Sequence, residues 1–191
     1  MKKITRSPST VLFPAPVVLV TSAALDGRPN VFTVAWTATV NSIPPMISIS
    51  ARPATYSHGL IKQSGEFVVN IPNVKLVWEV DYCGMVSGRD VDKFAATGLT
   101  PMPAKHVRAP LIEECPVNIE CRVTQTLKPG GHEMFLGEIL AVHFNEDAVD
   151  EKGQPDIDRI SPYAYCASGY RLIGEKIGHY GFSKKQPRNG T

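Results

Sequence analysis

The sequence predicts a mainly β protein with helices, of the α+β class, in which strands close into an antiparallel barrel and a helical insertion packs outside it. Short runs of β-branched residues separated by turn residues occur in both halves of the chain, and the helical signals fall between them. The 191 residues and the 43% hydrophobic content fit one domain with one core, 1–191. An N-terminal arm, 1–14, and a flexible polar tail, 183–191, are expected to lie outside that core.

The first strands are marked by apolar runs between turns. The run 17–24 leads into an Asp-Gly turn, a dipeptide that favours a tight reversal. The run 31–40 is expected to return beside it. Pro44 and Pro45 disfavour a helix before a third strand at 46–51. These three segments predict an antiparallel meander.

The helical insertion is expected to begin with a helix over 56–64. Thr55 is the predicted N-cap, because its hydroxyl can accept a hydrogen bond from a backbone N–H of the first turn. Gly65 is the predicted C′ residue. The apolar run 67–71 then indicates a return to strand.

Two further helices are expected after this strand. Asn73 is the predicted N-cap of the first, which should end before Gly84. Ser87 and Asp90 have the spacing of a capping box, and they predict a short helix over 91–97.

The second half of the chain returns to strands. In 117–124 apolar residues alternate with polar ones, which is the period of a half-buried strand. The Lys-Pro-Gly-Gly segment 128–131 predicts a hairpin connection to a nearly apolar partner strand at 134–144. The run 160–168, which holds two tyrosines, is expected to add a further strand.

Charge and hydropathy narrow the class of protein. The formal net charge of +2 is too small to indicate nucleic acid or an anionic membrane surface as a partner. No apolar run approaches the roughly 18 residues that a membrane-spanning helix needs. Pro14 and Pro16 break the apolar stretch that follows the basic N-terminus, unlike a signal peptide. We therefore expect a cytoplasmic protein.

The four cysteines show no C-x-x-C pair and no metal-binding spacing. They are expected to be reduced, mostly buried thiols, with a redox dithiol as the alternative. The chain also lacks the G-x-G-x-x-G and P-loop motifs, the H-E-x-x-H metal motif and the G-x-S-x-G nucleophile motif. No metal is expected, and no glycine-rich nucleotide site is indicated.

Arg52 stands just before the first predicted helix and is the strongest candidate for binding an anion. Its planar guanidinium can hold two phosphate oxygens. Thr55 and Ser57 add hydroxyls, and the unpaired N–H groups of the first helical turn add the positive end of the helix dipole. The alternative is a surface arginine beside an ordinary capped helix.

A second candidate site lies on the preceding strands, at Asn30, Trp36 and Thr37. Thr33, Thr37 and Thr39 alternate and should share one face, which suits a groove that hydrogen-bonds the edge of a heterocycle. Trp36 could form a wall of this groove, with core packing as the alternative for a lone tryptophan in a strand.

Lys93 and His132 are the remaining candidates from local patterns. Lys93 could bring a second cation to a phosphate or to an anionic ring. Alternatively, it is a solvated helix residue paired with Asp90. His132 follows a Gly-Gly turn and could donate to a cofactor or a substrate, or could simply be exposed.

Several of these segments together resemble one protein family. They are PVVLVTSAALDGRPNVFTVAWTATVNSIPPMISISARPATYSHGLIKQSGEFVVNIP, then SGRDVDKF, then the late strand pair and PYAY. The Ala-Arg-Pro followed by Thr-Tyr-Ser, with the F-V-V-N-I-P strand after the helix, is specific as a combination. Over 16–169 the chain resembles the flavin reductase-like, FMN-binding split-barrel family, and within it the flavoredoxin-type branch.

The resemblance implies a split β-barrel and a homodimer, with FMN in a groove near the subunit boundary. It implies that the phosphate is bound by Ser50, Arg52, Thr55 and Ser57, together with Lys93. It implies that the flavin ring lies along Asn30, Trp36 and Thr37. It also implies that His132, as a catalytic residue, and Tyr165 lie near the flavin.

Two functions are open on this resemblance. The first is an FMN-dependent oxidoreductase of the flavin reductase or flavoredoxin type. It would pass electrons from NADH or NADPH through bound FMN to a flavin, a redox partner protein or a small-molecule acceptor. The second is a non-enzymatic FMN-binding electron-transfer protein reduced by a partner protein, since no separate pyridine-nucleotide signature is visible. A split barrel without flavin, in a structural or haem-binding role, is a third possibility.

Overall fold

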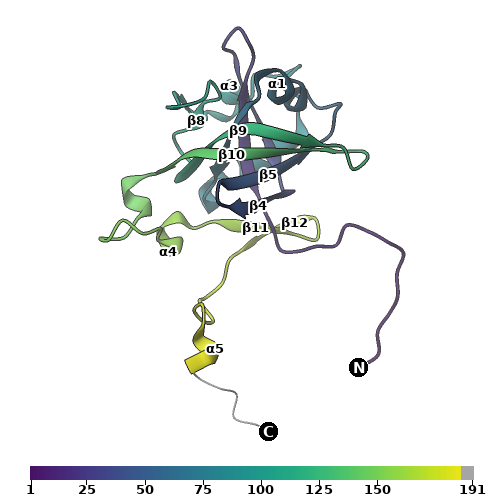
Figure 1. Cartoon of the computed structure of the whole chain (residues 1–191), viewed down its shortest axis with the longest axis vertical. Coiled ribbons are helices and arrows are strands. Elements are labelled where there is room, and N and C mark those ends of the chain that lie inside the picture. Colours follow the sequence, from purple (N-terminus) through teal and green to yellow (C-terminus); the bar gives the residue numbers. More distant parts are fainter. Residues whose placement is uncertain (186–191) are drawn as a thin grey trace.

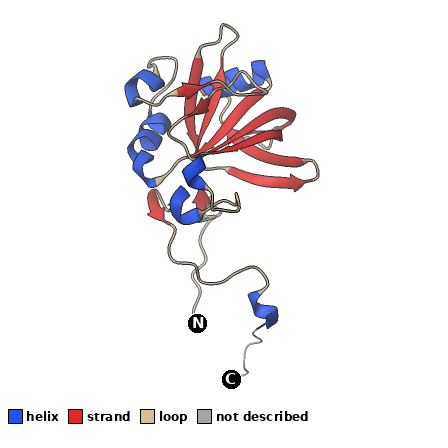
Figure 2. Cartoon of the chain, turned by 90° about the vertical axis from the view of Figure 1, so that its left-hand side faces the viewer, coloured by secondary structure: helices blue, strands red, loops and turns tan. Residues whose placement is uncertain are grey.

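A seven-stranded antiparallel sheet dominates the structure, a computed structural model that describes residues 1–185 (Figures 1 and 2). In spatial order its strands are β3 (Pro29–Val34), β2 (Val18–Ala23), β6 (Glu66–Ile71), β9 (Val117–Leu127), β10 (Glu133–Phe144), β5 (Pro45–Ala51) and β4 (Thr37–Ser42). The two edge strands, β3 and β4, are consecutive in the chain, so the sheet curls round until its edges approach each other. The predicted mainly β fold with a split barrel is confirmed.

The prediction of one continuous strand over 31–40 is wrong, because the chain breaks at Trp36 into β3 and β4. β3 pairs with β2 and β4 pairs with β5, at opposite edges of the sheet. The Trp36 carbonyl accepts the N–H of Ser50 at 2.9 Å, which extends the β4–β5 pairing by one residue. The expected meander is therefore two hairpins, and Thr33 and Thr37 do not share a face of one strand.

Apolar side chains from β2, β3, β5, β6, β9 and β10 fill the barrel interior. Cys121 and the half-buried Ile119 and Val123 project inwards from β9, as the alternation predicts. Gly137 of β10 lies so close to Phe67 that a Cβ on it would stand 2.6 Å from the ring atom Cζ. Close packing of this kind fixes the register of the strands that carry the site.

Helix α1 (Tyr56–Ser64) has the predicted bounds. The Thr55 side chain accepts the N–H of His58 at 3.3 Å, and Gly65 takes the left-handed conformation with φ 69°. Ile61 of α1 is buried in the core cluster of the barrel, so this helix packs directly against the interior strands.

Helices α2 (Val77–Met85) and α3 (Lys93–Thr97) cover the outer face of the β2–β3 hairpin. Asn73 is a cap as predicted, since its side chain accepts the N–H of Lys75 at 3.0 Å, but it caps the 3₁₀ turn η1 (Val74–Leu76) that precedes α2. Gly84 lies inside α2, so the predicted end of that helix is wrong. Continuous helical hydrogen bonding up to Val86 overrides the glycine.

The predicted start of α3 is also wrong. Ser87 and Asp90 form a turn, in which the Ser87 carbonyl accepts the N–H groups of Asp90 and Val91, both at 3.1 Å. The N-cap is Asp92, whose carboxylate accepts the N–H of Ala95 at 3.1 Å. Asp92 takes the N-cap position because its carboxylate stands next to the first helical residue, whereas Ser87 lies too far from the helix start.

A separate three-stranded sheet carries β1 (Ala15–Pro16), β11 (Tyr163–Cys166) and β12 (Gly169–Leu172). The predicted strand 160–168 is therefore too long, because Ile160 ends helix α4 (Ile157–Ile160) and Ser161 follows in the left-handed conformation. The predicted tail, 183–191, begins within α5 (Phe182–Lys185), and 186–191 lie outside the described residues. The short remaining elements are β7 (Pro101–Met102), β8 (Leu111–Ile112) and the 3₁₀ turn η2 (Glu146–Ala148).

Both termini leave the body of the protein from this small sheet (Figure 1). The predicted N-terminal arm, 1–14, is exposed and has no helix or strand before β1.

Candidate ligand-binding site

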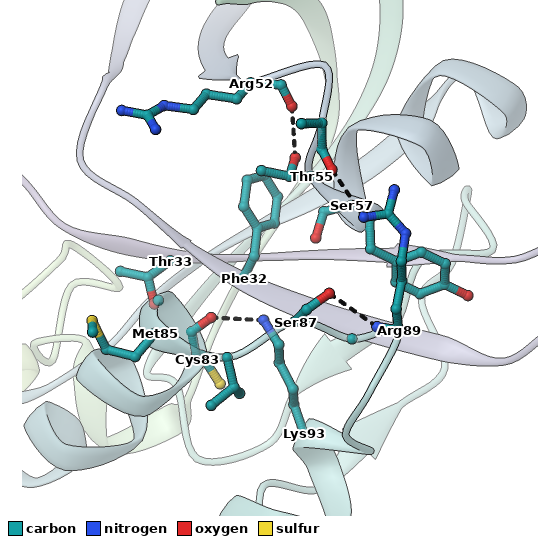
Figure 3. Close-up of a pocket in the computed structure, with 15 residues that line it drawn as sticks. Phe32, Thr33, Arg52, Thr55, Ser57, Cys83, Met85, Ser87, Arg89 and Lys93 are labelled. Carbon is teal, nitrogen blue, oxygen red and sulfur yellow. Dashed lines mark hydrogen bonds between the residues drawn. The ribbon is translucent and has the colours of Figure 1, made fainter.

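A cavity of about 430 Å³ opens where the first turn of α1, the end of α2 and the segment leading into α3 meet (Figure 3). We call it the anion cavity, because guanidinium, ammonium and hydroxyl groups line it and no carboxylate of the described lining residues does. Its volume lies within the range of small-molecule sites, roughly 300–1,000 Å³. Four residues predicted from the sequence line it, namely Arg52, Thr55, Ser57 and Lys93.

The start of α1 presents hydrogen-bond donors to this cavity. The Thr55 hydroxyl donates to the Arg52 carbonyl at 2.9 Å while it caps His58, so the turn into the helix is fixed at both sides. The N–H groups of Tyr56 and Ser57 precede the first intrahelical hydrogen bond and stand at the positive end of the helix dipole. A negatively charged group placed here would gain both effects.

Asn30 supports the cavity from behind and does not line it. Its side-chain amide donates to the Ser57 hydroxyl oxygen at 2.7 Å, and both residues are buried. The Ser57 hydroxyl can therefore turn its own hydrogen towards a ligand. Gly88 packs on the same amide, since a Cβ on it would lie 2.0 Å from the Asn30 Oδ1. Asn30 thus fixes two walls of the cavity relative to each other.

Two arginines flank the start of α1. Arg52 is exposed and makes no ion pair with any described residue. Arg89 was missed by the sequence prediction. Its Nη1 donates to the Ala54 carbonyl at 2.9 Å, and its guanidinium carbon lies 5.8 Å from the centre of the Tyr56 ring. In Figure 3 the two guanidinium groups lie on opposite sides of Thr55.

Lys93 is buried at the floor of the anion cavity, with 4% of its surface exposed. Its Nζ donates to the Cys83 carbonyl at 2.7 Å and does not pair with Asp90, so the alternative of a solvated helix lysine is wrong. Burial lowers the pKa of this ammonium group. One carbonyl partner leaves two N–H donors for a ligand, and a bound anion would favour the charged form.

A second hollow of about 770 Å³ lies between the N-terminal arm and the β4–β5 hairpin. Trp36, Thr37 and Ser50 line it, and we call it the Trp36 hollow. Trp36 is 48% exposed, so core packing is the wrong explanation for this tryptophan. The Thr37 hydroxyl oxygen is buried and has no hydrogen-bond partner among the described residues. An unpaired buried hydroxyl is costly, and a ligand in the hollow could satisfy it.

His132 and Tyr165 differ in their distance from this hollow. The His132 ring lies against Trp36, with 4.5 Å between ring centres. Tyr165 instead packs on Tyr170, at 5.7 Å between ring centres. It reaches the hollow only through its β-partner Ala15, which lines it.

The predicted site residues therefore form two groups. Asn30, Arg52, Thr55, Ser57 and Lys93 belong to the anion cavity. Trp36, Thr37, Ser50 and His132 belong to the Trp36 hollow. Strand β5 and the loop after it join the two groups, because Ser50 and Arg52 are two residues apart in the chain.

The four cysteines are free thiols, as predicted, and three of them are buried. Cys83 lines the anion cavity, but burial raises the pKa of its thiol to about 11, which disfavours a reactive thiolate. Within 1–185 no cluster of three His, Cys, Asp or Glu side chains could hold a metal ion. None of the helices in that range has the length and hydropathy needed to cross a membrane.

Comparison with known proteins identifies the family. Residues 10–174 match the Flavin reductase like domain. The flavoredoxin of Desulfovibrio vulgaris (Miyazaki F) has a similar structure, with a TM-score of 0.90 and 34% identity over 96% of this chain and 100% of that one. The flavoredoxin from Methanosarcina acetivorans has a TM-score of 0.89 and 31% identity over 97% and 99%. An uncharacterized protein of Archaeoglobus fulgidus is 36% identical over 77% of this chain and 81% of its own. The chain belongs to the flavin reductase-like family, in its flavoredoxin-type branch.

Proposed function

We propose that this protein binds FMN and acts as an FMN-dependent oxidoreductase of the flavin reductase or flavoredoxin type. It would pass electrons from NADH or NADPH to a flavin, a protein or a small-molecule acceptor. The observation that carries the proposal is a cavity lined by cationic and hydroxyl donors at a helix N-terminus, two residues along the chain from a hollow with an exposed tryptophan.

The residues present fit such a ligand. A phosphate monoester carries close to two negative charges at neutral pH, and Arg52, Arg89 and Lys93 supply three positive ones around a single cavity. The hydroxyls of Thr55 and Ser57 add neutral donors. We assign the phosphate to these groups, and we assign Ser50 to the ring end together with Thr37 and Trp36.

Bound FMN would supply the hydride or electron transfer, because that chemistry belongs to the cofactor. The residues of this chain bind and orient. The anion cavity would fix one end of the ligand, and Thr37, whose buried hydroxyl has no partner among the described residues, lies in the wall of the hollow that would hold the heterocycle. His132, whose ring is tilted by 46° against that of Trp36, could hold or donate a proton at a ring nitrogen beside the hollow. Tyr165 would act at a distance, by holding Ala15 in the wall of the hollow.

The visible spectrum of the purified protein tests the proposal. We expect flavin absorption bands, or their appearance when FMN is added to colourless protein. Anaerobic mixing with NADH and with NADPH should then bleach the flavin band rapidly. A protein that stays colourless and binds no added FMN would end the proposal.

The alternative is an FMN-binding electron-transfer protein that a partner protein reduces. It is favoured by the similarity to two proteins named flavoredoxin, at 34% and 31% identity. The same residues would bind the cofactor. A flavin band that resists both nicotinamides but is bleached by dithionite would support this alternative over the enzyme.

We extend the proposal to a homodimer. Support comes from the terminal arms, where Leu12 is 93% and Ile177 is 99% exposed although both side chains are apolar. A second copy could cover them, and the N-terminal arm already lines the Trp36 hollow. Light scattering on the eluted protein would measure the mass directly. The cytoplasmic location stays a prediction from the sequence.

A further inference from the structure

We propose that His58 and Glu133 are a positioning pair that couples the anion cavity to the Trp36 hollow. Neither residue lines either cavity. The proposal rests on the proposed function in one respect, because it takes the two cavities to hold the two ends of one ligand.

The pair is buried between α1 and the start of β10. The His58 Nε2 lies 2.9 Å from the Glu133 Oε2, with the two residues 4% and 8% exposed. The His58 ring packs on Phe135 of the barrel core, at 5.2 Å between ring centres. The imidazole is therefore held both by packing and by a directional contact.

Each partner stands next to a different part of the site. His58 belongs to the first turn of α1, and its N–H is the one that Thr55 caps. Glu133 directly follows His132, whose ring lies against Trp36. Through the pair, the turn that faces the anion cavity is connected to the start of β10, where His132 lies against Trp36 and Met134 lines the Trp36 hollow.

The sheet register connects the pair to Arg52 as well. Glu133 lies opposite Ala51 in the β10–β5 ladder, and Arg52 is the next residue along the chain. A displacement of Glu133 would therefore move His132 on one side and the strand end that carries Arg52 on the other.

Stability does not explain why a polar pair, His58 with Glu133, occupies this position. Replacing a buried ion pair by well-packed apolar residues is often neutral or stabilising. A second pair, buried Glu120 with half-buried His143, shows the contrast, because Glu120 also accepts the N–H groups of Lys105 and His106, at 2.9 Å and 2.6 Å. That carboxylate anchors a loop.

Glu133 anchors no loop backbone. Its other neighbours of opposite charge among the described residues are the exposed ammonium groups of Lys62 and Lys128, at 3.9 Å and 3.7 Å. Glu133 instead contacts the His58 side chain of α1. Its role is therefore to fix the position of α1 relative to the hairpin that carries His132.

The consequence is a coupling between the two cavities. An anion bound at the start of α1 stabilises one position of that turn. Because His58 contacts Glu133, this position of the turn also fixes the positions of His132 and Trp36. Because binding coupling is reciprocal, a ring in the Trp36 hollow would raise anion affinity by the same factor.

Riboflavin and inorganic phosphate test this coupling, since together they are FMN divided at its ester bond. Riboflavin affinity is measured on cofactor-free protein by fluorescence, with and without saturating phosphate. We expect phosphate to tighten riboflavin binding about fivefold or more in the native protein. In the double variant His58→Leu with Glu133→Leu, which keeps apolar packing and removes the directional contact, we expect no change on adding phosphate.

Matched variants separate coupling from stability. Glu133→Gln keeps a hydrogen-bonding group and should retain part of the phosphate effect. Glu120→Gln removes the carboxylate of the Glu120–His143 pair and should retain all of the phosphate effect, even if it lowers the unfolding temperature. If the double variant does not fold, His58→Phe keeps the packing on Phe135 without a ring nitrogen and should abolish the effect in the same way.

The outcomes are distinct. Riboflavin affinity that ignores phosphate in the native protein, or a phosphate effect that survives loss of the pair, overturns the coupling. If the native protein binds FMN tightly in either case, the proposed function stands without it. If neither FMN nor riboflavin binds, the proposed function fails and the coupling fails with it.

Discussion

The anion cavity and the Trp36 hollow are built in opposite ways. In the anion cavity the donors at the start of α1 come from one short continuous segment, Arg52 to Ser57, in which a strand end, an N-cap and a helix start follow one another, and Arg89 and Lys93 complete the lining. The Trp36 hollow is assembled from the N-terminal arm, the strand break at Trp36 and strands β5 and β10, and His132, far along the chain, lies against Trp36. Local chemistry specifies the donors at the start of α1, and the topology of the barrel specifies the hollow.

The largest effect should come from removing the two guanidinium groups of the anion cavity. Each charged hydrogen-bonding partner contributes about 1.5–3 kcal/mol, so Arg52→Ala and Arg89→Ala together should weaken FMN binding by about 4 kcal/mol. Riboflavin, which has no phosphate, should bind both proteins with similar affinity. Calorimetric titration of cofactor-free protein with each ligand measures the difference.

Arg28→Ala is the matched control for this pair. Arg28 is exposed and pairs with Asp26 at 2.8 Å in the β2–β3 turn, outside the lining of either cavity. Its removal should leave FMN affinity unchanged. An equal loss of riboflavin affinity in the double arginine variant would mean that the guanidinium groups serve the ring end, and the division into two cavities would be wrong.

Gly88→Ala should disrupt the anion cavity by a steric route. A Cβ at this position would lie 2.0 Å from the Asn30 Oδ1 and 2.9 Å from a Tyr56 ring atom, so the segment that carries Arg89 must move. Such overpacking costs about 1–3 kcal/mol of unfolding free energy, and FMN affinity should fall with it. Urea unfolding and FMN titration measure the two effects.

Gly59→Ala, in the same helix as Ser57, is the contrasting substitution. Nothing lies within 4 Å of a Cβ there, so the change should stabilise the protein by up to about 1 kcal/mol and leave FMN binding intact. Equal behaviour of the two alanine variants would show that the Asn30–Gly88 contact does not shape the cavity.

The contrast between the two regions explains what the sequence could predict. Thr55 and Gly65 mark the ends of α1 through side-chain and backbone chemistry that acts within one helical turn, and both were predicted correctly. Arg89 was missed because its contact with Ala54 joins segments 35 residues apart. A basic residue directly after Ser87-Gly88 is a local signal for an anion-binding turn. The local sequence does not indicate which helix that turn packs against.

The break at Trp36 is a feature that the local sequence could not predict. The run 31–40 is rich in β-forming residues, and no proline or glycine marks a break in it. The break arises because the two halves pair at opposite edges of a closing sheet, which is a property of the whole barrel. The sequence likewise does not state which cavity Ser50 faces, since the side of β5 on which it lies depends on where the barrel closes, and the structure places it in the lining of the Trp36 hollow.

Trp36→Ala should weaken FMN binding by about 1 kcal/mol, less than the arginine substitutions, because it removes stacking area and no charge. It should also weaken riboflavin binding equally and shift the flavin absorption bands. Trp78→Ala is the control, since Trp78 is also exposed but stacks on Tyr82 of α2, at 5.1 Å between ring centres. Unchanged flavin spectra in the Trp36 variant would exclude this hollow as the ring site.

The smallest effect concerns acid stability, and it tests the contact that joins the two regions. The hydrogen bond from His58 holds the pKa of Glu133 below its ordinary value of 4.5. The unfolded chain therefore takes up a proton at Glu133 at a higher pH than the folded protein does. This carboxylate stabilises the fold above about pH 4.5, and that contribution is lost as the pH falls through the lower folded value.

Urea midpoints measured at about pH 6 and about pH 3.5 should therefore differ less in Glu133→Gln than in the native protein, because the amide does not titrate. Glu138→Gln lies on the same strand, at a position that makes no ion pair with a described residue, and should keep the native difference. If Glu133→Gln loses as much stability between these two pH values as the native protein does, the acid sensitivity belongs to other carboxylates, Glu120 among them. The contact between α1 and the β9–β10 turn would then be too weak in solution to join the cavities, and they would have to be treated as independent sites.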